Sequence, residues 1–193
     1  MDLALARALG LAVGAGVNLY ATVLVLGLAA RYEWVELPAA FEPLASPWVI
    51  GVAGGFYVLE FLADKVPWID TAWDALHTLV RPIGAAAIAT VALGPAEPGM
   101  QALAAILGGT IGASTHAAKA GSRLAVNTSP EPATNVFASL AEDGFVVGLV
   151  VLLMTHPWIG VAVAAAALAA VAVIVVLLIR LWQGRRERTP SAG

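Results

Sequence analysis

The ionisable residues of this chain are few, and many of them recur at helical spacing inside long apolar segments. Residues three or four positions apart lie on one face of a helix. Such faces are formed by Glu60 with Asp64, by Asp70, Asp74, His77 and Arg81, by His116, Lys119 and Arg123, and by Asn135, Ser139 and Glu142 with Asp143 adjacent. An ionisable group at the centre of a bilayer costs from about 2.5 to more than 10 kcal/mol, so these groups should face one another or a hydrated cavity. Their chemistry would be the binding or relay of an ion or a proton.

Two of these faces suggest a specific contact. An ion pair between Arg81 and Glu142 or Asp143 is the simplest way to neutralise both helices, and it could be purely structural. Adjacent residues lie about 100° apart around a helix, so one arginine is not expected to satisfy both carboxylates. The remaining carboxylate could carry a proton. Asp70 is expected to cap the start of its helix.

Enzyme chemistry has weaker support. Oxygen and imidazole ligands for a metal ion are present in Glu60, Asp64, Asp74 and His77, but no dense metal-binding motif occurs. Serine-hydrolase, P-loop and dinucleotide-binding motifs are also lacking, and the chain has 0 cysteines. No cofactor is expected, and the question of a metal stays open.

The composition is that of a membrane protein. Of the 193 residues, 60% are hydrophobic and 12% are charged, against roughly 25% charged in a typical soluble domain. The mean hydropathy is +0.86, and the net charge of -3 gives no case for a nucleic-acid partner. A span needs about 20 apolar residues, and six segments qualify: about 5–30, 48–64, 72–94, 100–120, 132–155 and 159–182. We expect an all-α transmembrane helix bundle forming one domain over 1–193, with the first segment retained rather than cleaved as a signal peptide.

The positions of Lys and Arg predict the orientation. A cytoplasmic basic tail at 183–193 and six spans place both termini in the cytoplasm, with nine of the 10 basic residues on that side and Arg31 outside. The loop after the first span carries Glu33, Glu36 and Glu42 instead. Trp34, Trp48 and Trp158 are expected at the outer interface, and Trp68, Trp73 and Trp182 at the inner one. The expected location is the cell inner membrane, crossed several times.

A weak internal repeat is another expectation. Gly54-Gly55 and Lys65 match Gly108-Gly109 and Lys119 at an offset of 54 residues, which suggests two hairpins, 48–95 and 100–155. Glycines four apart recur at Gly10/Gly14, Gly51/Gly55, Gly108/Gly112 and Gly144/Gly148, a spacing that favours close helix packing. The last segment is apolar all round and should face lipid or another copy of the chain.

Several motifs together resemble one family. They are Gly16-Val-Asn18-Leu-Tyr20, Glu60-Phe-Leu-Ala-Asp64-Lys65-Val-Pro67, Asp70-Thr-Ala-Trp-Asp74, Arg81-Pro82, the segment from Lys119 to Pro132, and Glu142-Asp143. The chain is similar to the small bacterial membrane proteins labelled domain of unknown function 4126, over nearly its whole length to about residue 155. The resemblance implies a polytopic inner-membrane protein and brings no activity with it.

The polar faces predict a small transporter or channel-like protein with a charged cavity open to the cytoplasm, coupled to a proton or cation. An anionic group could be attracted by Arg81, Lys119 and Arg123, and a homo-oligomer is expected to enclose the pathway. The alternatives are a membrane enzyme or a lipid-headgroup or metal-binding protein that uses the same cluster, and a scaffold whose charges only lock helices together. The expected pathway residues are Asn18, Glu60, Asp64, Lys65, Asp74, His77, Arg81, His116, Lys119, Arg123, Asn127, Glu131, Asn135, Ser139, Glu142 and Asp143.

Overall fold

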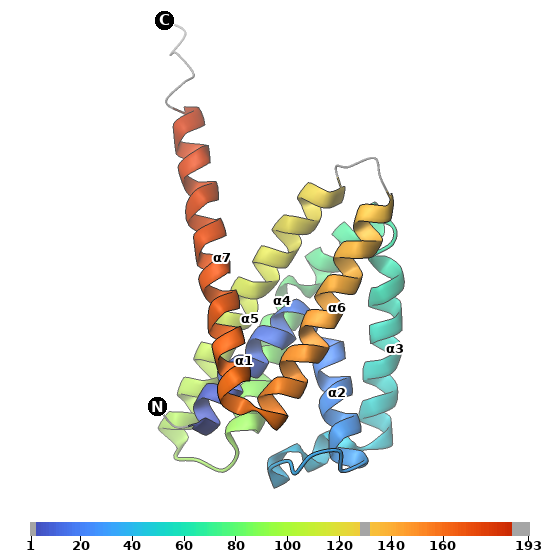
Figure 1. Ribbon diagram of the computed structural model, residues 1–193, viewed down its shortest axis with the longest axis vertical. Coiled ribbons are helices and arrows are strands. Elements are labelled where there is room, and N and C mark those ends of the chain that lie inside the picture. The colour runs from blue at the N-terminus through green and yellow to red at the C-terminus, as the bar shows by residue number, and fades with distance from the viewer. Residues whose placement is uncertain (1–2, 128–131, 187–193) are drawn as a thin grey trace, which may run out of the picture.

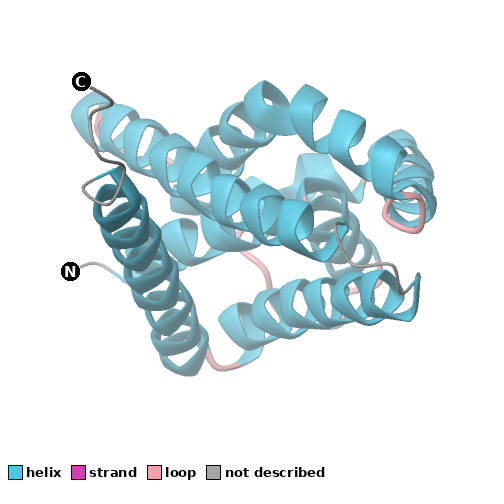
Figure 2. Ribbon diagram, turned by 90° about the horizontal axis from the view of Figure 1, so that it is seen from above, coloured by secondary structure: helices cyan, strands magenta, loops and turns pink. Residues whose placement is uncertain are grey.

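The computed structural model of the chain describes residues 3–127 and 132–186, and its regular structure there is helical throughout (Figure 1). The elements are α1 (Leu3–Val17), α2 (Leu19–Arg31), the short 3-10 helix η1 (Ala39–Ala45), α3 (Pro47–Ala63), α4 (Pro67–Leu93), α5 (Pro98–Asn127), α6 (Pro132–Thr155) and α7 (Pro157–Arg186). Seen from above, these helices form one bundle joined by short connections (Figure 2). The predicted all-α fold is confirmed.

A proline begins each of the long helices from α3 onward. Pro47, Pro67, Pro98, Pro132 and Pro157 are the first residues of these helices. Proline suits this position because its missing N–H would have no partner within the helix, and its fixed φ is already helical. The predicted segments after the first therefore agree with α3 to α7, although α4 begins at Pro67 rather than at 72.

The predicted span over 5–30 is wrong in its continuity, because Asn18 divides it. Asn18 has an extended backbone (φ -146°, ψ 100°), and its side chain accepts a hydrogen bond from the N–H of Ala21, capping the start of α2. The resulting helices have 15 and 13 residues, and each is too short to cross a bilayer alone. A single asparagine lowers the mean hydropathy of an apolar segment only slightly, so the hydropathy of 5–30 does not reveal the break at Asn18.

The two short helices form a re-entrant hairpin, which rises to the middle of the bundle and returns to the end it left (Figure 1). Ala4 and Arg7 line a cavity with Gly94, where α4 ends. At the turn, Asn18 reaches Asp143 in the middle of α6. After α2, Trp34 lines a cavity with Thr155, where α6 ends. We call this end of the molecule the η1 end, and the opposite one the Lys65 end.

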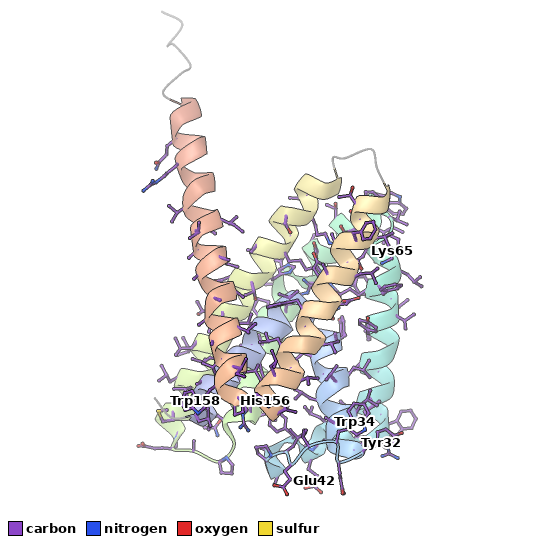
Figure 3. All side chains as sticks on the ribbon, in the orientation of Figure 1. Tyr32, Trp34, Glu42, Lys65, His156 and Trp158 are labelled. Carbon is purple, nitrogen blue, oxygen red and sulfur yellow. The ribbon has the colours of Figure 1, made fainter. Side chains whose placement is uncertain are left out.

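This hairpin changes the predicted topology. Since α1 begins at the η1 end and α7 runs from there to the Lys65 end, the two described ends of the chain lie at opposite ends of the bundle (Figure 1). The prediction that both termini lie on one side is therefore not confirmed, since the described ends of α1 and α7 lie at opposite ends of the bundle. Arg7 lines a cavity with residues of η1 and Arg31 donates to the carbonyl oxygen of Ala45, so both lie at the η1 end. Lys65 lies at the other end (Figure 3). Of the other residues predicted to be cytoplasmic, Arg81, Lys119 and Arg123 pair with carboxylates in α3 or at its C-cap, and α3 is the helix that ends next to Lys65.

Three described helices are long and apolar enough to cross a membrane, namely Pro67–Leu93, Thr134–Thr155 and Pro157–Val176. The pair η1 and α3, bent by 68°, makes a fourth if it counts as one span. Exposed tryptophans occur near both ends: Trp34, Trp48 and Trp158 at the η1 end and Trp68 at the other. This arrangement resembles the aromatic belts of membrane proteins. Trp34 and Trp158 are labelled in Figure 3.

The core of the bundle is α1, which packs against α4, α5, α6 and α7. Leu11, Ala12 and Val13 are completely buried. Close approach depends on glycine: a Cβ at Gly16 would lie 2.6 Å from the carbonyl oxygen of Gly112. Close packing at Gly10, Gly108 and Gly112 is as expected, but a Cβ at Gly51, Gly55, Gly144 or Gly148 would meet nothing within 4 Å. The predicted repeat stays a prediction, and its matched glycines have different surroundings.

Candidate functional site

The polar faces of α3, α4, α5 and α6 meet in one buried network of ion pairs, which begins at Glu60. This carboxylate is completely buried on α3. Its Oε1 accepts from Arg81 Nη2 of α4 at 2.7 Å and from Lys119 Nζ of α5 at 2.9 Å. Removal of a charge from water is repaid only when such partners are close and well oriented. Glu60 therefore links α3, α4 and α5 at a buried point where each of these charges needs an opposite charge beside it.

Arg123 organises the part of the network nearer the Lys65 end. Its Nη2 donates to Asp64 Oδ2 at 2.7 Å and to Glu142 Oε2 at 3.0 Å. Its Nη1 donates to the carbonyl oxygen of Asn135 at 3.2 Å. Lys119 Nζ, 3.4 Å from Glu142 Oε2, connects this group to Glu60. The four helices are thus held by alternating positive and negative side chains.

Ser139 and Lys65 extend the network toward the loop between α3 and α4. Lys65 Nζ donates to Ser139 Oγ at 3.0 Å, and Ser139 Oγ donates to Asp64 Oδ2 at 3.0 Å. Burial lowers the pKa of Lys65, against the effect of the nearby Asp64 carboxylate. Lys65 Nζ also lies 3.6 Å from the centre of the Phe61 ring. Lys65 is half-buried in the turn between α3 and α4, so it lies between the buried network and that end of the bundle.

Hydrogen bonding identifies the neutral tautomer of His116. Arg81 Nη1 lies 2.9 Å from Nδ1 of His116, and a guanidinium can only donate. Nδ1 must therefore accept, so Nε2 carries the proton and donates to the carbonyl oxygen of Asp74 at 3.1 Å. The Asp74 carboxylate lies 3.7 Å from Arg81 Nη1. Arg81 therefore uses Nη1 for His116 and Nη2 for Glu60, so the two hydrogen bonds do not compete for one donor.

Asp143 stands apart from these ion pairs. Its two carboxylate oxygens accept from Asn18 Nδ2 and from the Tyr57 hydroxyl, both at 3.1 Å. Both donors are neutral, and within the described part of the chain Asp143 makes no ion pair. It is buried near the start of α2, where the helix dipole favours a negative charge. Asp143 is therefore a buried carboxylate whose hydrogen-bond donors are neutral and which has no ion pair in the described ranges.

Two tyrosines belong to the site although the sequence analysis did not select them. Tyr57 lies three residues before Glu60 on the same face of α3, a spacing that could have indicated it. Tyr20 donates its hydroxyl to His77 Nε2 at 2.8 Å, while Nδ1–H of His77 donates to the carbonyl oxygen of Trp73 at 2.7 Å. His77 thus lies beside the network with partners of its own.

The predicted ion pair between Arg81 and Glu142 or Asp143 is wrong. Arg81 pairs with Glu60, while Glu142 pairs with Lys119 and Arg123. The predicted cap is wrong as well, because the cap residue of α4 is Val66, and Asp70 lies buried within the first turn. Because Pro67 takes the first helical position, α4 begins three residues before Asp70, the predicted cap.

The other expected pathway residues fall into two groups. The structure brings together Asn18, Glu60, Asp64, Lys65, Asp74, His77, Arg81, His116, Lys119, Arg123, Asn135, Ser139, Glu142 and Asp143, in the contacts given above. Glu131 and the side chain of Asn127 lie outside the described residues. Among the residues described, no three His, Asp or Glu side chains are placed to hold a metal ion.

Several buried polar atoms of the network still lack a hydrogen-bond partner. Within the described ranges they are Glu60 Oε2, Asp64 Oδ1, Asp74 Oδ1, Arg81 Nε and Asn135 Oδ1. A cavity of about 190 Å³ between α4 and α5 reaches the edge of the network and is lined by Asp74, Thr78 and Arg123 among others. Its walls are mainly apolar, but the Asp74 and Arg123 side chains give polar partners that a water molecule in it could bind. The network could therefore exchange protons or small ions with a hydrated space.

Membrane-like helices, a re-entrant hairpin and a buried ion-pair network together define the class: an all-α protein of membrane type with a charged interior. The chain belongs to the family described as "Domain of unknown function (DUF4126)", whose family model matches residues 5–181. The predicted family is confirmed. No curated protein and no solved structure is significantly similar to the chain.

Proposed function

We propose that this protein is a small membrane transporter or channel-like protein that couples movement of its substrate to a proton or small cation. The observation that carries the proposal is Asp143, a buried carboxylate without an ion pair among the described residues, at the turn of the re-entrant hairpin. Many transporters place broken helices and their binding sites near the bilayer midplane. The break at Asn18 and its contact with Asp143 match that arrangement.

The charges favour a proton or cation over an anion as the coupled species. Arg81, Lys119 and Arg123 are each bound to carboxylates, so their charges are already compensated. Asp143 has only neutral hydrogen-bond donors among the described residues, so it could gain a proton or cation without breaking an ion pair. The proposal accordingly assigns the coupling role to Asp143, and to Glu142 only as part of the ion-pair network.

The central test is flux in proteoliposomes that hold the purified protein under an imposed pH gradient, followed with a pH-sensitive dye inside the vesicles. We expect proton flux from the wild-type protein and at least a tenfold loss in Asp143→Asn, because an amide cannot take up the proton. Tyr57→Phe, which removes one hydrogen bond to Asp143, should retain flux with a shifted pH dependence. Glu97→Gln, in an exposed loop, is the matched control and should behave as the wild type.

Equal flux in Asp143→Asn and the wild type would remove Asp143 from the mechanism. Absence of proton flux from the folded wild-type protein, with and without sodium or potassium gradients, would favour the scaffold alternative. Vesicle preparations would first be matched for protein content and for helicity by circular dichroism, so that a folding defect is not scored as lost transport.

The proposal places the Lys65 end in the cytoplasm, because Lys65, Lys119 and Arg123 lie toward that end and positive residues favour the cytoplasmic side. The native chain has no cysteine, so single cysteines can report the side from which a membrane-impermeant maleimide reaches them. We expect Leu3→Cys and Glu97→Cys to be labelled from outside intact cells, and Ser122→Cys only after permeabilisation. Labelling of Leu3→Cys and Glu97→Cys from opposite sides would restore the six-span topology.

A further inference from the structure

A cavity at the η1 end has the composition of a site for an amphipathic molecule. It measures about 690 Å³ and lies between the start of α1, η1, the end of α4 and the start of α5. Most of its walls are apolar, and Arg7 is the one charged residue among those that line it. Thr90 and Gln101 add polar atoms, although Thr90 Oγ1 already donates to Ala86 and Gln101 Nε2 to Gly94. Cavities of this size hold drug-sized ligands.

Arg7 differs from the basic residues of the buried ion-pair network. Arg81, Lys119 and Arg123 each lie within ion-pair distance of a carboxylate. Arg7 makes no ion pair with any residue in the described ranges, and its Nε is buried without a hydrogen-bond partner. A guanidinium in this position needs an anion or water to satisfy its donors. Arg7 is thus a half-buried cation that the ion-pair network does not use.

The position of the cavity indicates what kind of anion could reach it. It opens at the η1 end, near the level of the exposed tryptophans Trp34, Trp48 and Trp158, which mark the expected membrane interface. Phosphate groups of lipids lie at that level, and arginine binds phosphate through paired N–H donors. The apolar walls, which include Ala39, Val91 and Leu93, suit a hydrocarbon chain. Water-soluble anions would gain nothing from those walls.

We propose that this cavity binds one anionic phospholipid, with the headgroup phosphate on Arg7 and part of an acyl chain along the apolar walls. The site is separate from Asp143 and does not depend on whether the protein transports protons. It identifies a lipid partner at the end of the molecule opposite the charged network.

The test compares lipids with the same acyl chains and different headgroups. Delipidated protein in detergent is titrated with phosphatidylglycerol or phosphatidylcholine, and bound lipid is measured by native mass spectrometry while the melting temperature is followed. We expect phosphatidylglycerol to bind preferentially to the wild type and about tenfold more weakly to Arg7→Gln, the usual effect of one charge-assisted hydrogen bond. Arg7→Lys keeps the positive charge and should retain the preference for phosphatidylglycerol.

Arg31→Gln is the matched control, since Arg31 is exposed at the same end and donates to the carbonyl oxygen of Ala45 at 3.4 Å. It should bind phosphatidylglycerol as the wild type does. Equal binding of phosphatidylglycerol to Arg7→Gln and the wild type would overturn the proposal. So would equal binding of the two lipids, or a full melting-temperature shift produced by inorganic phosphate alone, which would assign the site to a soluble anion.

Discussion

Replacing Glu60 with glutamine is expected to lower the stability of the protein by about 3 kcal/mol, near the lower end for breaking a buried ion pair. Glu60 is completely buried and receives both Arg81 and Lys119 on one oxygen. The variant leaves two buried cations short of their closest counter-charge. Their remaining partners, Asp74 and Glu142, lie farther away at 3.7 and 3.4 Å. The measurement is the free energy of unfolding in mixed micelles, with the melting temperature as a second readout.

The control for this prediction is Glu36→Gln, because Glu36 is an exposed glutamate in the loop after α2. A surface substitution of this kind should change stability by less than about 0.5 kcal/mol. The double variant Glu60→Gln with Lys119→Met should recover part of the loss, since it removes one uncompensated cation together with the carboxylate. Purely additive effects of the two changes would contradict direct coupling between these side chains.

The second large effect is expected at Gly16, in the last turn of α1. A Cβ at this position would overlap the Thr115 side chain and approach both the carbonyl oxygen and the Cα of Gly112, at 2.6 and 2.8 Å. Gly16→Ala must therefore push α1 away from the α5 backbone, which cannot yield as a flexible side chain can. Overpacking of this kind costs about 1–3 kcal/mol or more. We expect a lower melting temperature and, because Asn18 would move from Asp143, reduced flux.

Gly55→Ala is the matched substitution, since a Cβ at Gly55 in α3 would meet nothing within 4 Å. There the change should be neutral or slightly stabilising, because alanine is the better helix former by about 1 kcal/mol. If both variants melted at the wild-type temperature, the close contact between α1 and α5 would be refuted.

The helices after the first predicted span could be predicted because their boundaries are local. A proline at each start, and glycine or proline in the connections, are read directly along the sequence. The residues of the charged faces were also predictable, since helical spacing places Asp74, His77 and Arg81 on one side of α4, and all three are buried.

The partners of these residues could not be predicted, because pairing depends on which helices are neighbours. The helical faces allow Arg81 to meet a carboxylate on α3 or on α6, and no feature of α4 alone distinguishes Glu60 from Glu142. The break at Asn18 was hidden for a related reason. A single asparagine within an apolar run can continue a helix with its side chain turned to a polar neighbour, or end it by capping the next one. Here Asn18 does both: its side-chain N–H donates a hydrogen bond to the Asp143 carboxylate, and its side-chain oxygen caps the start of α2.

The burial of α1 has a consequence for how the protein is made. This helix is synthesised before the helices that enclose it, which are α4, α5, α6 and α7. With 15 residues it cannot serve as a stable membrane anchor in the meantime. The hairpin of α1 and α2 can therefore reach its buried position only after the helices that pack against α1 have been made. In the assembly of this bundle, α1 would then reach its final position after helices that were synthesised later than it.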